Sequence, residues 1–365
     1  RKSLLIADQK EYIASITGLI LNVVSYLAII LLVTWEQNYL LALGIGTVTE
    51  VVLNIWISWY VEQKYPFLRQ RRKEKSTSSL TKRIVRDLKS LFISRISEKM
   101  LYCTDNLIIS GFIGVGTVGR YANYCMITQA ISNILTILAN TIQPTVGDYF
   151  TEKNRQRNYE ILRQLTFGFF CIASVVSVGL FSLITPFVRD IWLGPSYELG
   201  WGITVFCIVV LLVRIMGLPL SLVMGVTGLF EKEKNVGASS ALLNLIVSLA
   251  LVKPYGMAGV LLGTLLSYLL QILYRYIIYF RDFLEMPGEA LRYAQDIGEY
   301  LAVIAGEVLL MQKIVPLIYG AGGMLLFCVC FLLCIAIPLL LDLVIFGRGW
   351  RLQSIVTMVK GMRKA

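Results

Sequence analysis

The sequence contains no histidine at all, and this absence excludes several classes of function at the outset. Without an imidazole there is no histidine metal ligand, no histidine-containing catalytic triad and no histidine proton relay. Charge is also scarce, because only 16% of the 365 residues are charged, against about 25% in an average soluble protein. With 56% hydrophobic residues and a mean hydropathy of +0.70, the composition predicts an integral membrane protein.

Motifs for covalent chemistry and nucleotide binding are missing as well. The seven cysteines lie within apolar segments, so we expect them to act as small apolar side chains and not as a disulfide framework or a metal site. There is no P-loop, no nucleophile elbow and no hydrophilic stretch long enough for an ATPase domain. The sequence therefore predicts no cofactor and no metal, and any transport would draw on a gradient, the membrane potential or metabolism of the substrate.

Long apolar runs dominate the chain, since ten segments reach the roughly 20 residues that a transmembrane helix needs. The ten predicted helices are 12–34, 39–61, 89–113, 117–143, 160–187, 201–225, 235–252, 257–280, 297–318 and 322–346. Lys and Arg concentrate in alternate connectors, above all in 62–88, which by the positive-inside rule places both ends of the chain in the cytoplasm. The net charge of +11 is therefore interpreted as a topology signal and not as a nucleic-acid site.

A short internal repeat divides the chain into two similar parts. Asn22, in a Leu-Asn pair, and Thr47, in a Gly-Thr pair, have counterparts in Asn244 and Thr264 on the seventh and eighth predicted helices. Repeats of this kind are typical of transporters built from two similar halves. Four predicted helices precede the second copy and none precedes the first, so the repeat predicts four further helices upstream of Arg1, fourteen in all.

Polar residues inside apolar segments are the candidate functional residues, because a charge in lipid is costly and normally faces a bundle interior or an aqueous cavity. The basic candidates are Arg95, Lys99, Arg120 and Arg214. They could line a cationic path for an anionic substrate, since the guanidinium group suits bidentate pairing with phosphate. The polar or coupling candidates are Glu98, Asp105, Asn106, Asn123, Tyr124 and Glu50.

Two other interpretations of the charged helix 89–113 remain open. The charged side chains Glu98, Lys99 and Asp105 can pair internally and serve only helix packing. Asp105 can instead form a cation or proton site with its neighbour, although nearby basic residues would hold its carboxyl ionised. Glu307 also lies in the middle of a predicted helix, and the sequence names no partner for it.

Several short motifs resemble, in order and spacing, those of a known family. These motifs are Arg95-x-x-Glu-Lys, Thr104-Asp105-Asn106, Val118-Gly119-Arg120-Tyr121, Ile142-Gln-Pro144, Ile191-Trp192-Leu193-Gly194 and Tyr255-Gly256. They resemble landmarks of Wzx-type polysaccharide flippases, members of the multidrug/oligosaccharidyl-lipid/polysaccharide (MOP) exporter superfamily. The resemblance spans most of the chain.

This resemblance implies an all-α, MATE/MOP-like transporter with two helical lobes around a central cationic cavity. Residues 1–61 would be the last two helices of the N-lobe, 62–88 a basic cytoplasmic linker, and 89–280 a six-helix C-lobe. Residues 281–365 would be two extra helices with a basic cytoplasmic tail. The implied location is the bacterial cytoplasmic membrane, crossed many times.

The expected function is to flip an undecaprenyl-diphosphate-linked oligosaccharide, the repeat unit of a surface polysaccharide, by alternating access and without bond chemistry. Expected partners are this glycan lipid, membrane lipid and the polysaccharide synthesis machinery. The alternatives are a cation-coupled multidrug exporter of the same superfamily, a peptidoglycan-precursor flippase, and a membrane polysaccharide polymerase or glycosyltransferase. The enzyme is disfavoured because the longest exported connector, 188–200, holds few ionisable residues.

Overall fold

Helices account for almost all of the described structure, and within the described residues there is no strand. The computed structural model describes residues 4–5, 10–36, 38–66, 103–150, 154–320 and 322–347. Nine helices in this part of the chain are long and apolar enough to cross a membrane. The chain is therefore a multi-pass membrane protein, as its composition predicts. It divides into two compact units, Arg1–Arg83 and Ile84–Ala365.

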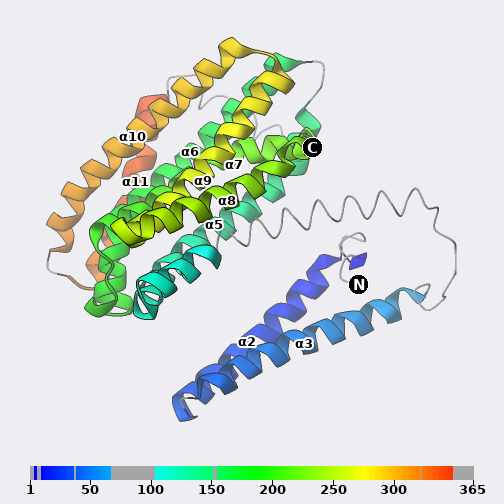
Figure 1. The fold of residues 1–365 in the computed structure, drawn as a ribbon, viewed down its shortest axis with the longest axis vertical. Helices are drawn as coiled ribbons and strands as arrows, with labels where there is room; N and C mark the ends of the chain where they lie inside the picture. The colour runs from blue at the N-terminus through cyan, green and yellow to red at the C-terminus, as the bar shows by residue number, and fades with distance from the viewer. Residues whose placement is uncertain are drawn as a thin grey trace. The chain divides into compact units, whose positions relative to one another are not determined.

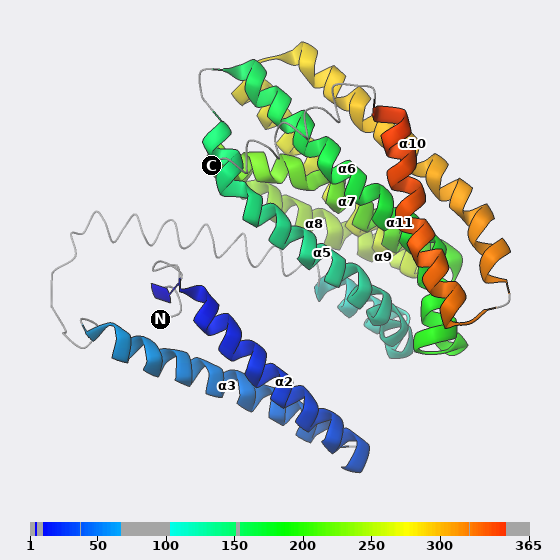
Figure 2. The same cartoon turned by 180° about the vertical axis from the view of Figure 1, so that it is seen from behind.

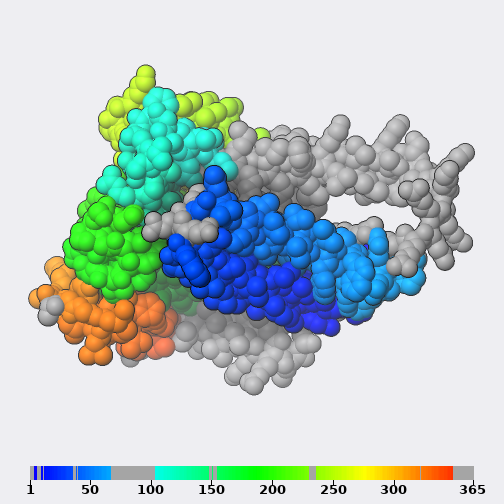
Figure 3. All heavy atoms as spheres, turned by 90° about the horizontal axis from the view of Figure 1, so that it is seen from below, coloured from blue at the N-terminus to red at the C-terminus, as the bar shows by residue number. Residues whose placement is uncertain are grey.

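The first unit is a helical hairpin formed by α2 (Glu11–Glu36) and α3 (Tyr39–Lys64). The Asn38 side chain caps α3 by accepting hydrogen bonds from the backbone amides of Leu40 and Leu41, at 3.1 and 3.3 Å. This satisfies two of the amides that a helix start leaves free. The two helices lie against each other (Figures 1 and 3). Most of their large apolar side chains are exposed, as expected of surfaces that face lipid.

The second unit is a bundle of long helices that begins with the helical residues 103–112. Its further helices are α5 (Val115–Tyr149), α6 (Arg155–Pro186), α7 (Trp201–Val226), α8 (Phe230–Tyr255), α9 (Met257–Ile277), α10 (Pro287–Tyr319) and α11 (Met324–Phe346). Short π-helical turns, η2 (Phe187–Trp192) and η4 (Ile278–Leu284), extend α6 and α9. In this unit α7 packs against α5, α6 and α9, and α8 pairs closely with α9 (Figure 1).

These helices confirm the predicted segments that fall on described residues. The largest difference is at α10, which begins at Pro287 and not near residue 297. Its first turns alternate polar and apolar side chains, so their mean hydropathy is too low for a sequence window to identify them as membrane-spanning. Proline at the first helical position is favourable for a helix start. Helix α5 likewise continues past Pro144 to Tyr149.

Helices α6 and α10 run in the same direction in a constant register. Arg163 contacts Asp296, and Ser174 contacts Glu307, so both pairs are 133 residues apart in the chain. Helix α11 also packs along α6 and touches α10, and the three helices lie together in both ribbon views (Figures 1 and 2). The last two helices are thus attached to the bundle mainly through α6, and α10 also contacts η4.

Candidate functional site

The close pairing of α8 with α9 is built on two glycines one helical turn apart. A Cβ atom on Gly263 would collide with the hydroxyl of Ser248, and one on Gly259 would collide with the backbone carbonyl of Leu251. Small residues at this spacing let membrane helices approach closely enough for their backbones and short polar side chains to meet. The approach creates a polar seam between α8 and α9.

The carboxylate of Asp105 enters this seam from the helical residues 103–112. Its side chain is 5% exposed, and both of its hydrogen-bond donors come from the α8–α9 pair. Thr264 Oγ1 donates to Asp105 Oδ2 at 2.7 Å, while Asn244 Nδ2 lies 3.4 Å from Asp105 Oδ1. Asn244 Nδ2 also donates to Thr264 Oγ1 at 2.9 Å. Three helices therefore meet at one buried group of polar side chains, here called the Asp105 cluster (Asp105, Asn244 and Thr264).

The Asp105 cluster brings a carboxylate, an amide and a hydroxyl together, and one of its polar atoms is left unsatisfied. Asn244 is fully buried, and its Oδ1 has no hydrogen-bond partner in the described part of the chain. The backbone carbonyl of Val260 lies 3.4 Å from Thr264 Oγ1 and 3.3 Å from Ser248 Oγ. A buried amide oxygen without a partner is costly, because it loses its water without gaining a hydrogen bond. The Asn244 amide oxygen is therefore the unsatisfied hydrogen-bonding position of this site among the described residues.

A monovalent hard cation fits this donor set. Carboxylate, amide, hydroxyl and carbonyl oxygens are the ligands that hard cations prefer. Both hydrogen-bond donors to Asp105 are neutral, so among the described residues its single negative charge is left for one positive charge to balance. The described residues also contain no group of three or more His, Cys, Asp or Glu side chains of the kind that holds a transition metal. Asp105, Asn244 and Thr264 would hold a sodium-sized ion, with Ser248 and the Val260 carbonyl within reach.

The other predicted site residues occupy varied positions. Arg120 is exposed near the start of α5, and Asn106, beside the buried Asp105, is also exposed. Asn123 Nδ2 donates to the backbone of its own helix at 3.0 Å. Tyr124 is buried, and its hydroxyl accepts a hydrogen bond from the Leu199 amide at 3.2 Å, which ties α5 to the loop before α7.

The remaining candidates fall on other elements or outside the described residues. Arg214 of α7 lies over the ring of Tyr268 on α9, with Cζ 5.4 Å from the ring centre. Glu50 is exposed on α3, in the first unit. The residues Arg95, Glu98 and Lys99 lie outside the described part of the chain. Their proposed role in a cationic cavity stays a prediction.

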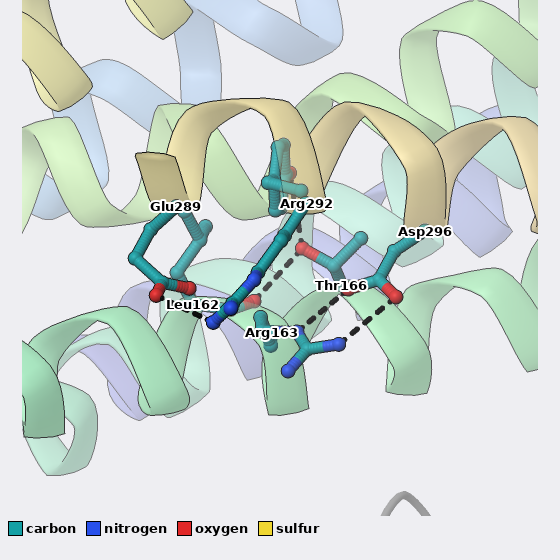
Figure 4. Close-up of polar contacts among 7 residues, drawn as sticks. Leu162, Arg163, Thr166, Glu289, Arg292 and Asp296 are labelled. Carbon is teal, nitrogen blue, oxygen red and sulfur yellow. Dashed lines mark hydrogen bonds and ion pairs between the residues drawn. The ribbon is translucent and has the colours of Figure 1, made fainter. Parts of the chain in front are cut away.

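A second polar group, which sequence reasoning did not identify, joins α6 to α10 near their first turns (Figure 4). Arg163 makes a two-pronged ion pair with Asp296, Nε to Oδ2 at 2.6 Å and Nη2 to Oδ1 at 2.9 Å. Beside it, the hydroxyls of Thr166 and Tyr293 lie 3.1 Å apart, and the Arg163 guanidinium lies over the Tyr159 ring. Because every charge here is paired, this group serves to hold α10 against α6.

Comparisons with known proteins agree with the observed architecture. A family model described as "Polysaccharide biosynthesis protein" matches residues 2–150, and no curated protein sequence matches the chain. A solved structure of the lipid II flippase MurJ, in an inward closed conformation, is similar with a TM-score of 0.67 and 15% identity. The match covers 94% of this chain and 70% of that chain. The chain thus has the all-helical, MOP-like membrane fold of MurJ, which confirms the predicted fold class.

Proposed function

We propose that this protein is a membrane transporter that moves a lipid-linked glycan between leaflets by alternating access, coupled to a monovalent cation at the Asp105 cluster. The observation that carries the proposal is the buried carboxylate of Asp105 beside Asn244, whose Oδ1 has no hydrogen-bond partner among the described residues. Ionisable groups at such depth in a helical bundle mark ion pathways more often than packing. The reaction makes and breaks no bond, so the protein would not be an enzyme.

The cation is proposed to act by changing how three helices pack. With the ion in place, the Asp105 charge is neutralised and α8, α9 and the helix bearing Asp105 are held together. Without it, the carboxylate depends on two neutral donors, and the free energy of the closed arrangement rises. A ligand that binds one arrangement better than another shifts the population toward it, as an alternating-access carrier requires.

Two comparisons support the proposed substrate class. The matching family model is described as "Polysaccharide biosynthesis protein", and MurJ is a lipid II flippase, so both support a lipid-linked glycan as the substrate. We propose an undecaprenyl-diphosphate-linked oligosaccharide, with Arg95, Lys99, Arg120 and Arg214 as ligands of the diphosphate. The peptidoglycan precursor is the second candidate, because the solved structure that covers most of this chain is a lipid II flippase.

The domain plan of the proposal keeps the boundaries that the sequence predicts. Residues 1–61 would complete one lobe, 89–280 would form the other, and 281–365 would add two helices and a tail, with 62–88 as a cytoplasmic linker. The site of action would be the bacterial cytoplasmic membrane, beside the polysaccharide synthesis machinery.

The proposal is tested with the natural protein in proteoliposomes that contain labelled lipid-linked oligosaccharide or lipid II in parallel. We expect sodium-dependent exposure of one labelled lipid on the opposite leaflet. This movement should be lost in Asp105→Asn and kept in the control Glu160→Gln, which changes an exposed carboxylate on α6. Movement of lipid II alone would select the second candidate. Efflux of cationic drugs without lipid movement would establish the multidrug alternative, and a new glycosidic product would establish an enzyme.

A further inference from the structure

A pair of carboxyl groups lies buried between the last two helices and α6, apart from the Asp105 cluster. Glu307 of α10 and Asp342 of α11 are each 3% exposed. Ser174 Oγ of α6 donates to Glu307 Oε2 at 2.6 Å. Asp342 lies one turn before Phe346 on α11 and Ser174 lies one turn after Phe170 on α6, so the contact between the Phe170 and Phe346 rings places Asp342 at the level of Ser174. Three helices thus bring two acidic side chains and one hydroxyl together.

Three of the four carboxyl oxygens in this pair have no hydrogen-bond partner. They are Glu307 Oε1, Asp342 Oδ1 and Asp342 Oδ2, and the statement holds for the described part of the chain. Removing an ionised carboxylate from water costs several kcal/mol even after relaxation. Two such charges side by side, with unfilled hydrogen-bonding capacity, are still less favourable. Something must compensate them.

No described basic side chain compensates the pair. On α6 the facing ionisable group is the thiol of Cys171, and the nearest cation, Arg163, lies about 16 Å along the helix and is occupied by Asp296. On α10 the flanking groups are the hydroxyl of Tyr300 and the exposed Lys313, roughly 10 Å to either side. On α11 the nearest ionisable group is the thiol of Cys334, two turns away.

An aromatic layer closes the pair off on the side where α6 and α10 begin and α11 ends. It is formed by Phe167, Phe170, Tyr300 and Phe346. Phe170 stacks on Tyr300 with ring centres 4.4 Å apart, and Phe346 meets both edge-on at 5.5 and 5.8 Å. Phe346 lies one turn from Asp342, and Phe170 lies one turn from Ser174, the donor to Glu307, so water has little access from that side.

We propose that Glu307 and Asp342 form a second ion site whose ligand is one proton shared between the two carboxyl groups. A shared proton makes one carboxyl a donor to the other, satisfies two of the three partnerless oxygens and removes one of the two charges. A metal cation fits less well, because the described side-chain contacts of the pair include no amide oxygen and only one hydroxyl, that of Ser174. The site is independent of the proposed transport function.

The proton links charge to helix packing. Its departure would leave like charges facing each other where α10, α11 and α6 meet, and the pair would repel. Its return would restore the hydrogen bond between α10 and α11. The protonation state of Glu307 and Asp342 therefore sets how firmly α11 is held against the bundle.

Infrared difference spectroscopy of the intact purified protein tests this directly and needs no glycan. At neutral pH the wild type should show a protonated-carboxyl stretching band that shifts in D₂O and converts to carboxylate at high pH. Either Asp342→Asn or Glu307→Gln should change the frequency of that band and the pH at which it converts to carboxylate, because the remaining carboxyl no longer shares its proton. The control Glu160→Gln should leave the band unchanged.

The variant Ser174→Ala provides a second test if the acidic variants fail to fold, because it keeps both carboxyl groups. In this variant the band should persist at a changed frequency, because Glu307 loses its donor. A wild type with no protonated-carboxyl band at neutral pH would overturn the proposal. So would a band unaffected by either acidic variant, or a Glu307- and Asp342-dependent carboxylate band that shifts when sodium replaces potassium.

Discussion

The two hairpins that carry the internal repeat share sequence marks but differ in packing. In α8–α9, a Cβ on Gly263 would collide with Ser248, whereas in α2–α3 the equivalent Gly46 has nothing within 4 Å of the same position. The threonines that follow also differ. Thr264 donates to the carboxylate of Asp105, while Thr47 donates to the Leu43 carbonyl of its own helix at 2.9 Å.

The contrast shows that the repeated residues do not make a site by themselves. A site forms where the helices approach closely and a third helix adds a charge. Asn244 is fully buried in such a place, and its counterpart Asn22 is only half-buried. Matched substitutions in the two hairpins measure this difference.

The largest expected effect is steric. Gly263→Leu should lower the free energy of unfolding by about 3 kcal/mol, because the new side chain forces α9 away from α8. Gly46→Leu should stay within about 0.5 kcal/mol. Denaturant titration in mixed micelles gives both values. Equal losses in the two variants would remove the distinction in packing.

The second effect is cation-dependent. Sodium at about 100 times its dissociation constant should stabilise the wild type by about 2.7 kcal/mol. Asp105→Asn should abolish the gain, because the site loses its charge, and Asn244→Leu should weaken it. The matched Asn22→Leu should leave it intact. Thermal unfolding in sodium against potassium reports the gain, and a full sodium effect in Asp105→Asn would place the ion elsewhere.

The third effect isolates one hydrogen bond. Thr264→Val should cost about 2 kcal/mol, since a buried carboxylate loses its shortest donor. Thr47→Val should cost less than about 0.5 kcal/mol, because its hydroxyl is exposed and bonds only within α3. The same denaturant titration compares them. A reversed order would mean that Asp105 does not depend on Thr264.

The smallest effect concerns Ser267, the counterpart of Glu50. Its hydroxyl bonds to the Ser240 carbonyl across the helix pair at 2.9 Å, so Ser267→Ala should cost about 1 kcal/mol. Glu50→Ala, on an exposed face, should change the free energy of unfolding by less than about 0.5 kcal/mol. A difference within measurement error would show that the α8–α9 seam tolerates the loss of a bridge.

Much of the fold could be predicted from the sequence, because a membrane helix is a local property. Apolar length alone locates the helices, and it misses only amphipathic turns such as those from Pro287 onward. The repeat also singles out Asn244 and Thr264. Their role as partners of Asp105 depends on contacts between helices, because they lie 139 and 159 positions after Asp105 in the chain.

The candidate sites show where local patterns stop being informative. Asp105 and Glu307 stand out as charges in apolar helices, so the sequence can mark them. Their partners cannot be deduced, because Ser174 and Asp342 become neighbours of Glu307 only through the register of α6, α10 and α11. A serine such as Ser174 is common in membrane helices, so its contact with Glu307 cannot be predicted from the sequence until the register of the helices is known.

The parallel register of α6 and α10 also has a consequence for how the protein is made. Arg163 and Ser174 each find their partner 133 residues later in the chain. A ribosome adding about 5–20 residues per second delivers Asp296 roughly 7–27 s after Arg163. During that interval Arg163 lacks the carboxylate of Asp296, while the ring of Tyr159 on its own helix is already present. The ion pair that holds α10 against α6 can therefore form only late in synthesis, after most of the bundle helices have been made.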